Sequence, residues 1–242
     1  MATTAMTMRD AESRERRFFL GMAVWIAVSV VAGFGAAFAM GHSSLASPWW
    51  VHLHALTFMT WTGLYVLQNA AVAGGQASLH RRLGWLAFGW ANWMVVIGIF
   101  ATCESLMAHR APPFFAPAYF LALDPITVLT FYAFTVSAIV LRQRTDWHRR
   151  LMLSGTIFLI SPAWGRMLPM PLLGGELGMW AILTIQLLLY FVVAAGFDLA
   201  TRRRVHPAYF WGVGGSIVAT ALMKPVSMIP AIAALAHTLT GA

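Results

Sequence analysis

Two histidines stand in nearly identical surroundings, although 68 residues separate them. His80 lies in residues 78–85, SLHRRLGW, and His148 lies in residues 146–153, DWHRRLML. Each is followed by Arg-Arg-Leu and then by a long apolar run, which indicates a repeated two-helix unit. Imidazole nitrogens bind transition metals and haem iron. The repeated histidines are therefore the first candidates for chemistry.

A second set of candidates follows one face of the apolar run that begins near residue 50. At 100° per residue, one stripe of this run contains His54, Thr57, Trp61, Tyr65 and Gln68. A polar stripe inside a membrane should face protein or water rather than acyl chains. We take His54, Gln68, His80 and His148 as candidate cofactor-binding residues, and the three histidines as candidate metal ligands. Each histidine has an alternative role as a cap at the membrane interface.

Several ionisable residues fall within or at the ends of other apolar runs. Asp124 would cost about 2.5–3.5 kcal/mol inside a membrane unless it is paired or hydrated. Arg166 reaches a similar depth and is its expected partner, either as a purely structural pair or within a pocket. Lys224 is the only lysine of the chain. We expect several of these groups to line one outward-opening polar pocket, with the candidates His54, Glu104, Asp124, Arg166 and Lys224.

The composition indicates that these residues belong to an integral membrane protein. The 242 residues are 60% hydrophobic and only 10% charged, which is outside the range of soluble domains. A membrane helix needs about 20 apolar residues, and seven such runs are present: 18–40, 50–73, 83–106, 114–141, 151–168, 177–199 and 208–235. We therefore predict an all-α polytopic bundle of one helix plus three hairpins, with a cytoplasmic segment 1–17 and a single transmembrane domain 18–242. One cysteine, Cys103, excludes a disulfide framework within one chain.

The arginines give this bundle an orientation. Of 16 basic residues, 13 fall in four places: 9–17, 81–82, 142–150 and 202–204. These places alternate along the predicted topology. The positive-inside rule then puts the N-terminus in the cytoplasm and, after seven helices, the C-terminus outside. We expect a multi-pass protein of the bacterial inner membrane whose net charge of +8 meets lipid headgroups, with no nucleic acid as partner.

The two HRRL motifs, together with HxHALxF at residues 52–58, Gln68 and Arg166, resemble a family of uncharacterised bacterial multi-helix membrane proteins. The likeness covers about half the chain, and no established activity comes with it. A more distant likeness is to two-haem transmembrane b-type cytochromes. That resemblance implies histidine ligands to haem b on facing helices.

Several functions remain open at this stage. The first is a redox protein that holds haem b or a quinone with the histidines. The second is a carrier, channel or sensor that binds a small polar or anionic solute, or relays protons, through the outer pocket. A retinal protein with Lys224 as Schiff base and an assembly subunit are less favoured. The sequence predicts neither the substrate nor the oligomeric state.

Overall fold

Helices make up every regular element in the part of the chain that the structure describes. The computed structural model describes the backbone of residues 2–241 and the side chains of residues 11–241. Its elements, in chain order, are α1 (Ala2–Ala39), α2 (Trp49–Ala73), α3 (Ala77–Met107), α4 (Pro117–Val140), α5 (Thr145–Leu159), α6 (Ser161–Met167), α7 (Met170–Leu173), α8 (Gly175–Gln186), a π-helical turn (Leu187–Phe191), α9 (Val192–Arg202), α10 (Pro207–Ser227) and α11 (Pro230–Thr240). The prediction of an all-α fold is confirmed for these residues.

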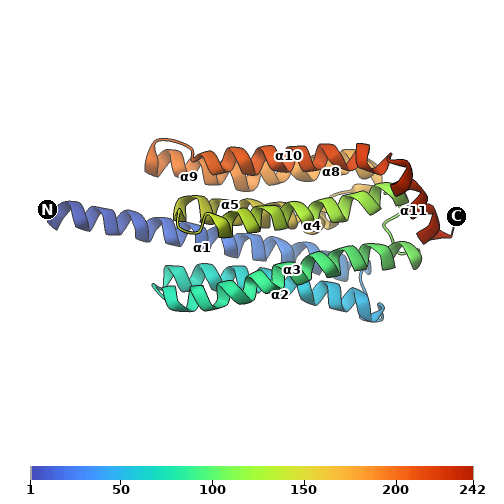
Figure 1. Cartoon of the computed structure of the whole chain (residues 1–242), viewed down its shortest axis with the longest axis horizontal. Helices are drawn as coiled ribbons and strands as arrows, with labels where there is room; N and C mark the ends of the chain where they lie inside the picture. Colours follow the sequence, from blue (N-terminus) through green and yellow to red (C-terminus); the bar gives the residue numbers. More distant parts are fainter. Residues whose placement is uncertain (1, 242) are drawn as a thin grey trace.

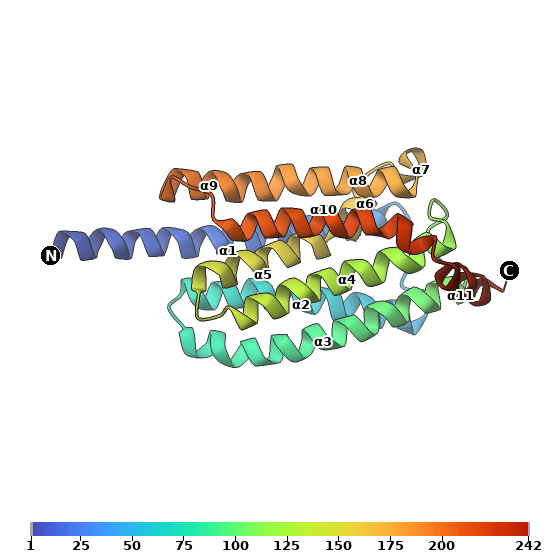
Figure 2. The ribbon, with the colours of Figure 1, turned by 45° about the horizontal axis from the view of Figure 1, so that its top comes forward.

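The long helices lie side by side along one axis. Figures 1 and 2 show α1 projecting beyond the others at its N-terminal end, while α11 lies across the opposite end. Helix α4 is the most central, because it packs against α3, α5, α10 and α11. Helix α3 packs against α2 and α4, and α5 packs mainly against α4 and α10. The bundle thus has two ends, which carry different side chains.

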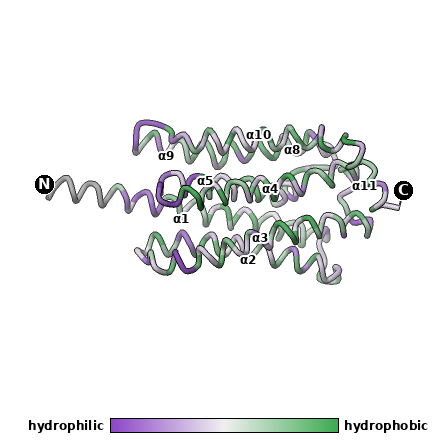
Figure 3. Tube along the Cα trace, viewed as in Figure 1, coloured by the Kyte–Doolittle hydropathy of each residue, from purple (hydrophilic) through white to green (hydrophobic). Residues whose placement is uncertain are grey.

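Four helices are long and apolar enough to cross a membrane: Ala11–Ala39, Ala77–Met107, Pro117–Val140 and Gly175–Arg202. The pair α10 and α11 adds a fifth if its 73° bend lies within one span. In Figure 3 the polar residues gather toward the ends of the bundle, and apolar residues cover its middle. This pattern is that of a helical membrane protein.

Proline explains two departures from the predicted runs. The run 151–168 breaks at Ile160, and a separate helix α6 begins with Pro162 in its first turn. The run 208–235 contains Pro225 inside α10, but the sharp bend comes just before Pro230. A proline is favourable in the first helical turn, where its missing N–H is not needed. The predicted cytoplasmic segment 1–17 is helical from Ala2 and forms the first part of α1.

Two glycines allow helices to approach closely. A Cβ atom on Gly33 of α1 would lie 2.3 Å from the carbonyl oxygen of Ala163 in α6. A Cβ atom on Gly212 of α10 would lie 2.2 Å from Oγ of Ser154 in α5. Small residues at such crossings are the usual basis of close helix packing in membranes. They fix α6 on α1, and α10 on α5.

The polar-aromatic stripe of α2 faces the interior, as its periodicity predicts. Thr57, Trp61 and Tyr65 are 1%, 2% and 5% exposed. On the other side of the bundle, the π-helical turn interrupts the segment formed by α8 and α9. Its Tyr190 is fully buried and donates a hydrogen bond to Ser29 of α1 over 2.6 Å. The turn is therefore anchored in the core.

Candidate functional site

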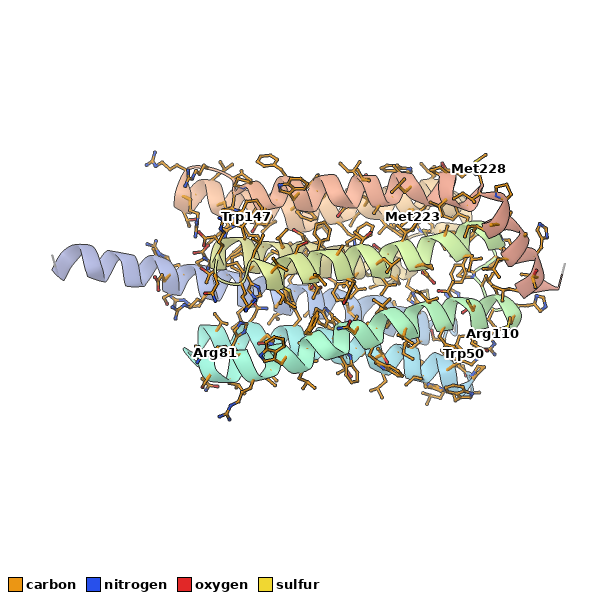
Figure 4. All side chains as sticks on the ribbon, viewed as in Figure 1. Trp50, Arg81, Arg110, Trp147, Met223 and Met228 are labelled. Carbon is orange, nitrogen blue, oxygen red and sulfur yellow. The ribbon has the colours of Figure 1, made fainter. Side chains whose placement is uncertain are left out.

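The two repeated histidines meet at one end of the bundle. His80 lies in the first turn of α3, and His148 lies in the first turn of α5. Their ring centroids are 6.1 Å apart, and the ring planes are inclined by 81°. Arg81 and Trp147, the neighbours of these histidines, are labelled at the same end in Figure 4. We call His80 and His148 the histidine pair.

Each ring of the pair has one nitrogen that is available to a ligand. Nδ1 of His148 donates a hydrogen bond to the carbonyl oxygen of Ala138 in α4 over 2.9 Å. Its Nε2 therefore carries the lone pair. Nδ1 of His80 is buried and has no hydrogen-bond partner among the described residues. A ring held through one nitrogen, with the other one free, is the arrangement typical of a metal-ligating histidine.

The surroundings of the pair combine a small residue, an amide and two cations. The backbone of Gln68 faces the His80 ring, and the side-chain oxygen of Gln68 is buried without a hydrogen-bond partner. Gly84 follows His80 by one helical turn, and a Cβ atom there would lie 3.8 Å from the Gln68 amide nitrogen. Arg81 and Arg149 are near enough for their charges to act on the imidazoles. Gln68, His80 and His148 thus come together as a group.

Next to the histidine pair lies a cluster of charges that the sequence interpretation missed. We call it the inner charge cluster, and it consists of Glu15, Asp146, Arg149, Arg150, Asp198 and Arg202. Three arginines meet three carboxylates, so the cluster is neutral. It joins α1, α5 and α9. The sequence signals were a carboxylate at the end of the run 177–199 and an acidic residue just before the second HRR.

Arg150 is the centre of the inner charge cluster. The side chains of Arg150 and Asp198 are both 0% exposed, and they form a bidentate ion pair through Nε and Nη2. Arg150 also donates to Glu15 over 3.1 Å. Its guanidinium lies 5.5 Å from the centroid of Tyr209. We assigned the basic residues to orientation and lipid headgroups, but Arg150 is buried in protein. Arg81 and Arg82 of the first motif are exposed.

The cluster lowers the pKa of Asp146. It also forms a hydrogen bond with the backbone of His206, the residue just before α10. Burial of Asp146 opposes its charge, but hydrogen bonds from Arg202 and Arg149 outweigh this, so the pKa of Asp146 lies below its ordinary value. Asp198 accepts a further hydrogen bond from the backbone N–H of His206 over 3.1 Å. The His206 ring in turn accepts one from the Ala208 N–H and so caps α10.

A second polar group lies toward the other end. We call it the outer polar group, and it consists of His54, Thr102, Asp124 and Arg166. Thr102 of α3 donates to Asp124 of α4 over 3.2 Å. Arg166 of α6 donates to the carbonyl oxygen of Pro162 over 2.8 Å and lies 4.1 Å from the centroid of Phe34. Its charge acts on Asp124 and on His54.

The expected ion pair between Asp124 and Arg166 is absent from the described part of the chain, although each lies within electrostatic reach of the other. His54 stacks on Phe58, with ring centroids 4.4 Å apart, and its Nδ1 is buried without a partner among the described residues. Glu104 follows Thr102 on α3, and its side chain makes no hydrogen bond or ion pair with residues 11–241. Three of the five pocket candidates are therefore neighbours.

Lys224 does not join the outer polar group. Its Nζ lies 3.4 Å from Oε2 of Glu176 in α8, and both side chains are about half exposed, at 54% and 51%. The sequence predicted the position of Lys224 along the helix axis, but not the side of α10 from which its side chain projects. A retinal Schiff base needs a lysine inside the bundle, and this position does not favour one.

Two shallow hollows are found at the surface, and neither contains these groups. One of about 270 Å³ lies at the turn after α1, where Gly41, His42, Ser44 and Arg110 line it. The other, of about 310 Å³, lies beside Glu12, Arg16 and Ala73. Within the described residues, no group of three or more His, Cys, Asp or Glu side chains converges on a metal position. The histidine pair is the strongest candidate for a ligand set.

No family model, curated protein or solved structure matches this chain.

Proposed function

We propose that this protein is a multi-pass membrane protein that binds haem b, and that His80 and His148 would hold its iron. One observation carries the proposal. Two imidazoles, each with a nitrogen left to offer, approach to 6.1 Å from helices that pack mainly on other neighbours. The haem would supply one-electron transfer, and the chain would supply its position and environment.

The spacing of the rings supports a shared metal ion. A metal–imidazole bond is about 2.0–2.1 Å long, and the ring centre lies about 1.1 Å behind the bonding nitrogen. Two imidazoles on opposite sides of one ion therefore have centroids about 6 Å apart. The ring centroids of His80 and His148 lie 6.1 Å apart, close to this value.

The number of ligands favours haem over a bare ion. A bare zinc site takes three or four protein ligands, whereas the pair offers two. Within residues 11–241 no third His, Cys, Asp or Glu joins them. A haem iron needs only two axial ligands, because the porphyrin supplies the other four. Two histidines without a third protein ligand among residues 11–241 therefore suit haem better than a bare ion.

Neighbouring residues suit the other parts of the ligand. Gly84 leaves space beside Gln68, on the face of α3 that carries His80. Arg81 is exposed and can meet a propionate, whereas Arg149 is already paired with Glu15 and Asp146. Neither surface hollow adjoins the pair. Space for the porphyrin edges has to come from rotation of the side chains around the histidines.

The proposal includes the membrane topology predicted from the sequence. Helices α2 and α5 with α6 would add two spans to the four or five that length and hydropathy support. With 13 of 16 basic residues in the N-terminal segment and alternate loops, the histidine pair would face the bacterial cytoplasm. Reporter fusions after residues 143 and 204 should be active only as cytoplasmic reporters. A periplasmic signal at residue 143 would reject this topology.

An absorption spectrum tests the haem proposal. Protein purified after haem-replete expression should show a Soret band, and His80→Ala and His148→Ala should each lose it or shift it strongly. The ferric protein should give a low-spin EPR signal, as expected if two imidazoles hold the iron. His237→Ala is the matched control, because this histidine is exposed on α11 and should leave the spectrum unchanged.

Rescue separates ligation from misfolding. In His148→Gly, imidazole added to the buffer should restore the low-spin spectrum, because it can occupy the space of the deleted ring. Size-exclusion chromatography of each variant checks its fold. Folded wild-type protein without a Soret band, or a spectrum that His80→Ala and His148→Ala leave unchanged, would reject haem ligation by this pair.

A further inference from the structure

The outer polar group has hydrogen-bonding capacity that the protein leaves unused. A guanidinium has five N–H donors, and Arg166 uses one of its nitrogens, on the Pro162 carbonyl. A carboxylate accepts about four hydrogen bonds, and Asp124 accepts one, from Thr102. Nδ1 of His54 is buried without a partner in the described part of the chain. Buried polar groups are normally satisfied, so a further molecule is expected at the His54 nitrogen, where the exposed Arg166 and the half-buried Asp124 can also bond to it.

The charges of the group favour a neutral molecule. Asp124 and Arg166 carry opposite charges and influence each other without forming a direct ion pair. An anion placed between them would meet the carboxylate, and a cation would meet the guanidinium. A neutral molecule with an acceptor at one end and a donor at the other satisfies both sides.

The shape of the surroundings favours a flat molecule. The guanidinium of Arg166 lies over the Phe34 ring, with 4.1 Å between the guanidinium carbon and the ring centroid. The imidazole of His54 stacks on Phe58, with an angle of 25° between the planes. Both polar groups are therefore planar and are backed by aromatic rings. A conjugated ring can stack in such surroundings while its edge forms hydrogen bonds.

We propose that the outer polar group binds the headgroup of a lipid-soluble quinone. A quinone carbonyl would accept hydrogen bonds from Arg166, and a hydroxyl of the reduced form would donate to Asp124 or to Nδ1 of His54. Quinones are neutral, flat and dissolved in the membrane, which matches the charge and the shape of the group and the apolar helices α3 and α4 that carry Thr102 and Asp124.

One feature of the fold gives access to the outer polar group, and a second one fixes its shape. Arg166, in the last turn of α6, is exposed at the surface. Gly33 holds α6 against α1, which sets Phe34, the next residue, beside Arg166. The site is separate from the histidine pair, because His54 and Gln68 are 14 residues apart on α2, or about 21 Å along the helix. The inference therefore does not depend on haem binding.

Titration with ubiquinone-1 tests the proposal. The short-chain quinone is added to purified protein in detergent, and quenching of tryptophan fluorescence is followed. Wild type should quench saturably, and Asp124→Asn and Arg166→Gln should each weaken binding about tenfold or more, the effect of losing a hydrogen bond to a charged group. Lys224→Gln is the matched control, since this exposed cation should leave the affinity unchanged. His148→Ala should bind like wild type.

Conservative variants guard against loss of the fold. Arg166→Lys and Asp124→Glu keep the charge and should retain part of the affinity, and each variant is checked by thermal unfolding. Equal affinity in wild type, Asp124→Asn and Arg166→Gln would overturn the proposal, and so would wild type that does not quench saturably. Displacement of the quinone by acetate or ammonium would show an ion site and would also overturn it.

Discussion

The inner charge cluster and the outer polar group use the same residue types in opposite ways. In the inner cluster three arginines face three carboxylates, and Arg150 alone is bonded to Asp198, Glu15 and the Asp146 carbonyl. In the outer group one arginine and one carboxylate lie apart, each with a single polar partner. Every inner charge is paired with an opposite charge of the protein, although Nε of Arg149 has no partner among the described residues, whereas the outer charges are not paired.

This difference separates structure from binding. A buried ion network with all partners in place joins helices and needs no ligand. An incompletely bonded pair in an apolar segment is costly unless another molecule completes it. We therefore interpret the inner cluster as the tie between α1, α5 and α9, and the outer group as a place that binds something. Substitutions in the two regions should differ in what they damage.

The largest effect is expected at Asp198. Asp198→Ala leaves the fully buried Arg150 without its bidentate partner, and removing one member of a buried pair typically costs about 3–5 kcal/mol. Unfolding of the detergent-solubilised protein by SDS titration measures this loss. Glu176→Gln is the control, because its half-exposed pair with Lys224 should contribute no more than about 1 kcal/mol. Similar losses in both variants would contradict a structural role for the cluster.

A smaller loss is expected when both members of the pair are replaced. In Arg150→Met with Asp198→Leu no buried charge is left unpaired, and Glu15 keeps Arg149 and Arg202. Exchange of a buried ion pair for apolar side chains is often close to neutral. The double variant should therefore unfold at higher SDS than Asp198→Ala. If it is less stable than the single variant, the charges are needed for more than mutual neutralisation.

In the outer group, Asp124→Asn should change stability by no more than about 1 kcal/mol, because only the hydrogen bond from Thr102 is weakened. Quinone affinity should fall in the same variant, as described above. The same SDS titration gives the stability. A loss of several kcal/mol would place Asp124 with the inner charges as a structural residue.

The smallest effect concerns pH. The folded pKa of Asp146 lies below its unfolded value of about 3.9. Its contribution is therefore fully present above about pH 5 and is lost as the pH falls toward the folded pKa. Unfolding temperatures measured between about pH 6 and pH 3 should fall less steeply for Asp146→Asn than for wild type. Parallel curves would show that Asp146 has the same pKa in both states.

Hydropathy and periodicity predicted the helical elements well. The stripe of α2 indeed buries Thr57, Trp61 and Tyr65, because helical periodicity fixes which side chains share a face. Helix ends were less predictable, since the break at Ile160 and the bend before Pro230 depend on local backbone choices. Seven spans and their orientation remain predictions.

The sites were only partly predictable, because one-dimensional spacing gives the height of a residue but not its neighbours. The repeat singled out His80 and His148, yet only packing of α3 and α5 around α4 brings them together. Glu15 and Arg150 meet across 135 positions of the chain, which no local pattern reveals. For the same reason the depth of Lys224 was a poor guide, and its partner is Glu176.

The π-helical turn at Leu187–Phe191 has a consequence for the register of its segment. Twelve residues separate Gln186 from Asp198, and in an unbroken α-helix they would point about 120° apart. The wider turn has about 4.4 residues per revolution and reduces this angle to about 30°. Both side chains can then face inward, where Gln186 donates to the Ile157 carbonyl and Asp198 holds Arg150. Deleting one residue from the turn would rotate Asp198 away from the core, and Arg150 would lose its ion-pair partner.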